Sequence, residues 1–324
     1  MKIVECVPNF SEGRDPVILD AIADAIRAVN GATLLDVDPG AATNRTVFTL
    51  VGDPDAAAEA AFQAIRRASE LIDMSTHQGE HARMGATDVC PFVPVSEVSM
   101  EDCVILARRL GQRVGEELGI PVYLYEAAAS RPERENLAEV RKGEYEGLAA
   151  KLADPEWAPD FGPASFNAGA GATAVGAREF LIAYNINLNT KKKKLAHDIA
   201  LTIREQGRAK RDEHNKMVRD ADGNKVMVPG LFRNVKAVGW VIEEYDCAQI
   251  SMNLTNFHVS PPHQVFDKVC ELAWDKGMRV TGSELVGLLP KQAMVDAGRH
   301  YLGKQGLNTG VSDDELIAVA VRSM

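Results

Sequence analysis

The chain has 324 residues, of which 46% are hydrophobic and 25% charged, and its 36 basic and 46 acidic residues give a formal net charge of −10. This composition excludes disordered and collagen-like chains, and the length predicts two domains or one duplicated unit. A nucleic-acid partner requires a basic stripe, whereas the basic residues here are scattered, so we expect small-molecule ligands and no nucleic acid.

The sequence also argues against export and membrane insertion. No stretch approaches the roughly 18 consecutive apolar residues of a membrane span, and Glu5 and Pro8 interrupt the first apolar run before a signal-peptide core forms. Five widely spaced cysteines, an odd number, predict buried thiols rather than disulfides or a metal cluster. We therefore expect a cytoplasmic protein without a membrane partner.

Hydrophobic periodicity in the first half predicts the order strand, helix, strand, strand, helix, strand. The corresponding ranges are 3–10, 16–29, 33–37, 45–51, 55–72 and 88–95. A further helix over 101–119 and a strand over 122–125 follow, and then a connector over 130–176 that is rich in loops. The pattern without these additions is βαββαβ.

The second half repeats this order. Its predicted elements are 180–188, 192–206, 235–243, 249–257, 261–276 and 280–289, and the charged segment 210–228 is typical of a solvent-facing hairpin. The same order twice predicts an α/β, more narrowly α+β, fold of two ferredoxin-like sandwiches, 1–178 and 179–324. We expect a ligand groove between them.

The densest group of chemically active side chains lies in 75–88, between a predicted helix and a predicted strand, where binding sites often occur. Its members include His77, Glu80, His81, Arg83 and Asp88. The spacing His77-x-x-Glu80-His81 matches a zinc pattern in which both imidazoles lie on one helix. Gly79 disfavours that helix and no third ligand follows at a suggestive spacing, so the metal-free alternative is the better one.

Without a metal, one of these histidines can transfer protons near neutral pH, because its unperturbed pKa is about 6.5. Asp38, in the predicted turn between two strands, is the candidate for orienting that imidazole. Nucleophile elbows and phosphate loops are absent from the sequence. The candidates for neutralising ligand carboxylates are Arg45, Arg83 and Arg178. The glycine-rich segment 160–171 is either a flexible linker or a loop whose amides approach a flat ring.

Several motifs together resemble the glutamate formimidoyltransferase family. In the first half they are Val7-Pro8-Asn9-Phe10-Ser11-Glu12-Gly13, Leu34-Leu35-Asp36-Val37-Asp38, Thr43-Asn44-Arg45-Thr46-Val47, Gly79-Glu80-His81-Ala82-Arg83-Met84-Gly85 and Asp88-Val89-Cys90-Pro91-Phe92. Further on they include Gly143-Glu144-Tyr145-Glu146, Trp157-Ala158-Pro159-Asp160-Phe161-Gly162-Pro163, Asn185-Ile186-Asn187-Leu188 and Gly282-Ser283-Glu284-Leu285-Val286-Gly287-Leu288. The resemblance covers essentially the whole chain.

The resemblance implies transfer of a formimino group from N-formimino-L-glutamate to tetrahydrofolate, giving 5-formiminotetrahydrofolate and glutamate in histidine degradation. It implies a homodimer in which each chain has two ferredoxin-like subdomains, tetrahydrofolate as co-substrate and no metal. The catalytic acid/base of the family motif corresponds to His81, which Asp38, the candidate from the residues themselves, would orient. The implied folate-contacting loop consists of Gly162, Pro163, Ala164, Ser165, Phe166, Asn167, Ala168, Gly169, Ala170 and Gly171.

The chain departs from the family pattern in two places. After Phe166, animal members carry a V-P-S-W-like stretch, whereas this chain has Asn167-Ala168-Gly169-Ala170 and so lacks an aromatic wall, and the hairpin 210–228 is longer than usual. The chain ends at Met324, so we expect the cyclodeaminase of some relatives to be a separate protein. A non-catalytic folate- or amino-acid-binding module is the second hypothesis, since paired ferredoxin-like units often act as sensors.

Overall fold

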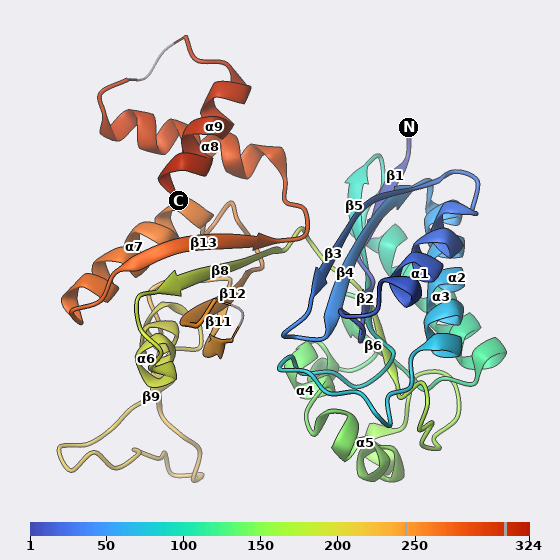
Figure 1. Cartoon of the computed structure of the whole chain (residues 1–324). Coiled ribbons are helices and arrows are strands. Elements are labelled where there is room, and N and C mark those ends of the chain that lie inside the picture. Colours follow the sequence, from blue (N-terminus) through green and yellow to red (C-terminus); the bar gives the residue numbers. More distant parts are fainter. Residues whose placement is uncertain (244, 308–309) are drawn as a thin grey trace. The chain divides into compact units, whose positions relative to one another are not determined.

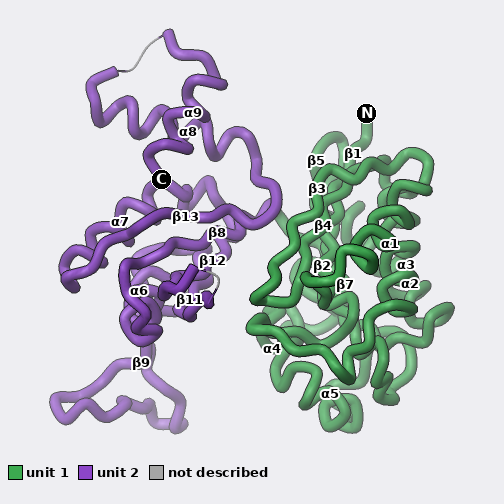
Figure 2. The backbone as a smooth tube through the Cα atoms, viewed as in Figure 1, with its two compact units in different colours: residues 1–179 green, residues 180–324 purple. Residues whose placement is uncertain are grey.

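The computed structural model describes residues 1–243, 245–307 and 310–324. Helices pack on β-sheets in this structure (Figure 1). The chain divides into two compact units, Met1–Glu179 and Phe180–Met324 (Figure 2). Each unit has its own hydrophobic core, as the length of the chain predicts. In the described residues, no helix combines the length and apolar character that a membrane crossing requires.

The first unit begins with the predicted βαββαβ order. Its elements are β1 (Ile3–Cys6), β2 (Asn9–Phe10), α1 (Pro16–Arg27), β3 (Ala32–Gly40), β4 (Arg45–Gly52), α2 (Pro54–Leu71) and β5 (Thr87–Ser96). The predicted strand 3–10 is thus two short strands, and both lie between β4 and β5. With β3 on the outer side of β4, all of these pairings are antiparallel.

Local sequence explains where the helices start and how they pack. The side chains of Asp15 and Asp53 accept hydrogen bonds from the first backbone amides of α1 and α2, and proline follows each cap. The buried face of α2 consists largely of alanines, which allow a helix to approach a sheet closely. Phe48 and Leu50 of β4 lie fully buried in the same core.

The sheet of the first unit is longer than predicted. After α3 (Met100–Leu118), β6 (Val122–Glu126) forms the sheet edge, and β7 (Thr173–Ala177) lies between β5 and β6, parallel to both. The connector is therefore not simply loops, because it ends in β7 and also contains α4 (Leu137–Val140) and α5 (Glu144–Ala153). Side chains from these two helices and from β6 form a second, smaller core.

The second unit has an antiparallel sheet in the order β11-β12-β8-β13. Its main elements are β8 (Ile182–Leu188), α6 (Lys193–Ile203), β11 (Val235–Ile242), β12 (Cys247–Leu254), α7 (Pro262–Asp275) and β13 (Val280–Val286). Two short strands, β9 (Arg208–Ala209) and β10 (Met227–Val228), close the predicted hairpin. Two helices that the periodicity did not predict follow β13, namely α8 (Lys291–Lys304) and α9 (Asp313–Ser323).

Both units contain the strand order expected of a ferredoxin-like sandwich. In each, the first strand of the βαββαβ pattern lies in the middle, with the third and fourth strands on its two sides and the second strand beyond the third. The predicted α+β class with two such units is confirmed. The groove expected between the units stays a prediction.

Candidate active site

Residues 72–86, which we call the histidine loop, connect α2 to β5 in the first unit. Hydrogen bonds hold this loop to other segments on two sides. On one side it lies against the β3–β4 turn, where the Asn44 amide donates to the Gln78 carbonyl at 3.0 Å. Gly79 fits this contact because a Cβ would lie 2.2 Å from the Thr43 carbonyl oxygen. The glycine that disfavours a zinc helix in the sequence is therefore needed for the packing of a loop.

On the other side, the histidine loop pairs with the end of the glycine-rich connector. Gly85 forms a β-bridge with Gly171, and the backbone amide of Ala86 donates to the Ala170 carbonyl at 2.9 Å. Gly171 has a φ of +67°, which a side chain would strain. This pairing fixes part of the predicted folate loop beside the chain segment that follows His81.

The His81 imidazole is half-buried and has a defined tautomer. Its Nδ1 lies 2.6 Å from the Ala82 carbonyl oxygen, and because a carbonyl only accepts, Nδ1 carries the hydrogen and Nε2 holds a lone pair. Burial, together with the positive charges of Arg45 and Arg141, lowers the His81 pKa to about 3, against the opposing effect of Asp88. His81 is therefore a neutral proton acceptor at physiological pH.

The positive charges beside His81 belong to a cluster of one buried carboxylate and two guanidinium groups. Asp88, fully buried at the start of β5, accepts from Arg45 Nη1 and Arg141 Nη2, each at 2.5 Å, and from the Met84 amide at 3.1 Å. Burial by itself would raise the Asp88 pKa, but Arg141 and Arg45 outweigh it and hold the pKa at about 2. Two cations against one anion leave a surplus positive charge close to His81, which suits an anionic ligand.

His77 is held differently, and its two ring nitrogens both have protein partners. Nε2 lies 2.9 Å from the Asn44 carbonyl oxygen, and Nδ1 accepts from Arg83 Nε at 3.2 Å. Burial is the main cause that lowers the His77 pKa. Residues 77–81 form no helix, and the described residues contain no group of three or more potential ligands arranged for a metal. The helical geometry that the zinc alternative requires is thus not present.

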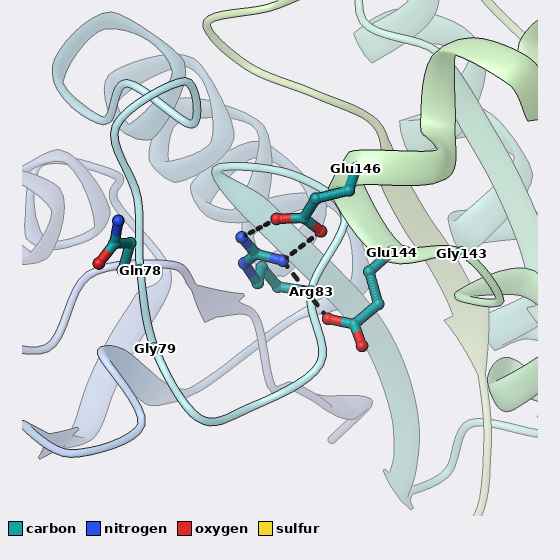
Figure 3. A pocket seen from close by; sticks show the side chains of 6 residues that line it. All are labelled: Gln78, Gly79, Arg83, Gly143, Glu144 and Glu146. Atoms are coloured by element: carbon teal, nitrogen blue, oxygen red, sulfur yellow. Dashed lines mark hydrogen bonds and ion pairs between the residues drawn. The ribbon is translucent and has the colours of Figure 1, made fainter.

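Arg83 lies in a pocket of about 410 Å³ that is lined by the histidine loop and the start of α5 (Figure 3). Its guanidinium binds both oxygens of Glu146, at 2.8 and 2.7 Å, and one oxygen of Glu144 at 3.4 Å. The predicted carboxylate-binding arginine is therefore already paired with two carboxylates of the chain. A ligand carboxylate would have to displace Glu146, whose side chain is 65% exposed.

The predicted folate loop is well tied only in its second half. Asn167 accepts from the amides of Ala170 and Gly171, at 2.9 and 2.8 Å, through its side chain and its carbonyl respectively. The Tyr145 hydroxyl donates to the Ala168 carbonyl at 2.7 Å, and its ring lies 5.4 Å from that of Phe166. The first half, residues 162–165, is exposed to solvent.

The other predicted site residues lie in three different settings. Asp38 is half-buried within β3, opposite Val47, rather than in a turn, whereas Arg45 belongs to the buried charge cluster. Arg178 follows β7, and its amide donates to the Phe92 carbonyl at 3.0 Å. β5 and β7 are paired strands: Asp88 lies near the start of this pair, and Arg178 lies just beyond its other end. The structure therefore groups His81 with Arg45 but not with Arg178.

Sequence reasoning assigned no role to three residues that define this site: Asp88, Arg141 and Glu146. Asp88 stands in the histidine-rich cluster, and Glu146 in a motif that resembles the family. No sequence motif pointed to Arg141. It lies more than fifty positions from its partner Asp88, in the connector that was predicted to consist mainly of loops. Pairing over such a separation becomes visible only in the fold.

Comparison with known proteins places both units in one family. Residues 3–178 match the N-terminal subdomain of the formiminotransferase domain, and residues 183–324 match the formiminotransferase domain. Glutamate formimidoyltransferases of Streptococcus pyogenes serotype M1 and Thermoplasma acidophilum are 44% and 45% identical over 93% and 96% of this chain and 93% and 95% of their own lengths.

A third relative extends beyond the matched region. Formimidoyltransferase-cyclodeaminase of Gallus gallus is 54% identical over 94% of this chain, which spans 53% of that relative. The chain thus covers about half the length of such relatives and nearly all of the two shorter ones. The chain belongs to the formiminotransferase domain family, and the predicted resemblance to glutamate formimidoyltransferases, which are transferases, is confirmed.

Proposed function

We propose that this protein transfers the formimino group of N-formimino-L-glutamate to its co-substrate tetrahydrofolate, forming 5-formiminotetrahydrofolate and glutamate in histidine degradation. The observation that carries the proposal is the His81 imidazole, whose Nδ1–H is bound by the Ala82 carbonyl and whose Nε2 is a proton acceptor. Its low pKa keeps it neutral at physiological pH. The two relatives that match over nearly their whole length are named glutamate formimidoyltransferases, which supports a formimino group as the group transferred.

The proposed reaction moves one proton through His81. A folate ring nitrogen bonds to the carbon of the protonated amidine, the electron pair of its C=N double bond moves onto the terminal nitrogen, and Nε2 of His81 takes the proton that the folate nitrogen releases. The imidazolium then protonates the glutamate nitrogen, the bond from that nitrogen to the former amidine carbon breaks as the terminal nitrogen re-forms its double bond to that carbon, and the imidazole is neutral again. Such acid/base catalysis contributes roughly 100- to 10,000-fold, and positioning both substrates contributes further.

The charge cluster supports this role in two ways. The surplus positive charge of Arg45 and Arg141 over Asp88 suits a substrate carboxylate. A bound carboxylate would also oppose the two guanidinium groups electrostatically and raise the pKa of His81, so that it becomes a stronger base when substrate is present. We assign Arg45 to this anion site, and we assign Arg83 to a carboxylate that displaces Glu146.

Of the remaining assignments, the folate loop and the homodimer rest on the family resemblance, whereas Asp38 and Arg178 rest on their positions in the sequence. The loop from Gly162 to Gly171 would contact folate, with Phe166 and Tyr145 as its aromatic surface, in place of the aromatic residue that this loop lacks. Asp38 as the partner of His81, Arg178 as an anion-binding residue, a homodimer, a separate cyclodeaminase and a cytoplasmic location stay predictions. Light scattering of the purified chain tests the homodimer directly.

Steady-state turnover of the purified chain with formiminoglutamate and tetrahydrofolate tests the proposed function. We expect glutamate release that requires tetrahydrofolate and continues in excess EDTA. Binding of either substrate without glutamate release would favour the non-catalytic module. Activity that EDTA abolishes and zinc restores would favour the zinc alternative.

A further inference from the structure

The sheet of the second unit carries a connected group of polar side chains on the face opposite its core. Alternate residues of β8, from Ile182 to Leu188, belong to the core, so Asn185 and Asn187 point to the other face. Trp240 of β11 pairs with Gln249 of β12, and Gln249 pairs with Asn187, which forms one row across the strands. Figure 1 shows these strands side by side, with β12 and β8 between β11 and β13.

Hydrogen bonds join five side chains of this face, which we call the amide network: Asn185, Asn187, Trp240, Gln249 and Glu284. The Trp240 indole donates to Gln249 Oε1 at 2.7 Å, and Gln249 Nε2 donates to Asn187 Oδ1 at 2.9 Å. Glu284 Oε2 accepts from Gln249 and from Asn185, both at 3.2 Å. Gln249 is only 1% exposed and Asn185 7%, so these amides are shielded from water.

Glu284 is the only acid of this network, and its hydrogen-bond partners are all neutral. Besides the two amides, its Oε1 accepts from the Tyr245 hydroxyl at 3.0 Å. In the ranges that the structure describes, no lysine or arginine pairs with it, and a carboxylate offers about four acceptor positions. One acceptor position therefore remains for a donor from outside the network.

The network also has an unused donor and open space beside it. Asn187 accepts through Oδ1, while no described residue accepts from its Nδ2. Gly282 of β13 is paired with Asn187 in the register, and a Cβ placed there would have no neighbour within 4 Å. A planar group can therefore approach the side of the network where Asn187 and Glu284 lie.

We propose that the amide network binds the aminopyrimidinone edge of the tetrahydrofolate pterin ring, an inference that rests on the proposed function. This edge offers adjacent N–H donors beside a carbonyl acceptor. Glu284 accepts from one of these N–H groups at its remaining acceptor position, and Asn187 Nδ2 donates to the carbonyl. The protonated amidine of formiminoglutamate fits less well, since it offers N–H donors but no carbonyl for Asn187, and the nearby carboxylates of the same molecule would be repelled by Glu284.

Glu284→Gln in the full chain tests this assignment, because glutamine keeps the shape and removes the charge. Titration calorimetry with tetrahydrofolate should show a Kd raised roughly 10- to 100-fold, as expected for losing one hydrogen bond to a charged group. The KM for formiminoglutamate should change less than about threefold. A tetrahydropterin without the glutamate tail should compete with tetrahydrofolate in the wild type and not in the variant.

The matched control is Asn253→Ala, an exposed residue on the same face of β12 and outside the network, which should bind tetrahydrofolate as the wild type does. Glu284→Asp, which keeps the charge and shortens the side chain, replaces the glutamine variant if circular dichroism shows that variant to be unfolded. An intermediate Kd is expected for it.

Two results would overturn this inference and leave the proposed function standing. In the first, the wild type is active and the Glu284 variants bind tetrahydrofolate normally. In the second, the Glu284 variants raise only the KM for formiminoglutamate. A wild type that neither binds tetrahydrofolate nor releases glutamate would instead overturn the proposed function, and the inference with it.

Discussion

The protonation state of His81 is decided by charge and burial rather than by its hydrogen bond. The bond from Nδ1 to the Ala82 carbonyl favours the charged ring, but burial and the two guanidinium groups are stronger and bring the pKa to about 3. His81 therefore cannot begin a reaction as an acid near neutral pH. The proton that it delivers must first come from the substrate, which fixes the order of the two proton transfers in the proposed reaction.

Replacing His81 by alanine should separate binding from catalysis. Because the imidazole is proposed to carry the proton and not to hold the folate, we expect turnover to fall roughly 100- to 10,000-fold while the Kd for tetrahydrofolate changes little. Stopped-assay turnover and calorimetry measure the two quantities. His214→Ala, in the exposed hairpin, is the control. Near-normal turnover in His81→Ala would remove His81 from the mechanism.

Arg141→Gln should change the titration of His81. Removing one of the two cations that lower the His81 pKa must raise that pKa, whereas Arg45 remains to neutralise Asp88. NMR of labelled histidine rings can follow His81, which in the wild type should show no titration between pH 5 and 8. The neighbouring exposed Lys142→Gln should leave the ring unchanged. A wild-type His81 that titrates near its ordinary pKa would contradict this electrostatic account.

At the scale of elements, the pairing of the histidine loop with the connector gives the site its shape. The periodicity predicted neither β7 nor this pairing, because β7 is five residues long, consists of small residues and contains a glycine. Its sheet position depends on parallel pairing with β5, from which it is separated by some eighty residues. By contrast, helices with long apolar faces, such as α2 and α3, were predicted to within two residues.

Gly85→Ala tests the importance of this pairing. An alanine Cβ at Gly85 would lie 2.2 Å from the Ala172 carbonyl oxygen and 2.7 Å from that of Ala170, so one segment must move. We expect a loss of about 1–3 kcal/mol in the free energy of unfolding and a raised KM for tetrahydrofolate. Urea unfolding and steady-state kinetics measure both.

The matched control for this substitution is Gly147→Ala. Gly147 lies within α5, where a Cβ has no neighbour within 4 Å, so alanine should stabilise the helix by about 0.5–1 kcal/mol. If Gly85→Ala behaves like this control in stability and kinetics, the pairing of the two loops does not shape the site.

At the scale of the whole molecule, the repeated βαββαβ order could be predicted because each strand and helix has a clear period of its own. The ion pairs and hydrogen bonds of the site could not be predicted from the sequence, because they join residues that are far apart in the chain and meet only in the fold. Asp88 with Arg141 is one example, and Glu284 with Gln249 is another in the second unit. The helices after β13 were also missed, since α8 and α9 bury short apolar faces largely against each other.

Both units should lose stability when the pH falls below about 6.5. His81 in the first unit and His263 in the second have folded pKa values of about 3 and about 4, in each case mainly through burial, so only their unfolded forms bind a proton between these values and 6.5. Each histidine can then reduce the free energy of unfolding by at most about 1.4 kcal/mol per pH unit. Asp88 acts later, because its stabilising charge is lost only as the pH falls from about 3.8 through its folded pKa of about 2.

Hydrogen exchange of buried strand amides between pH 7.5 and 4.5, corrected for the intrinsic exchange rate, can follow the two units separately. His81→Gln should flatten the pH dependence measured in β5, and His263→Gln should flatten that in β8, because glutamine does not titrate. His214→Gln should flatten neither, since that side chain is 74% exposed. If the slope in β8 survives His263→Gln unchanged, the burial of a neutral histidine is not what makes the second unit sensitive to acid, and other groups of that unit must take up the protons.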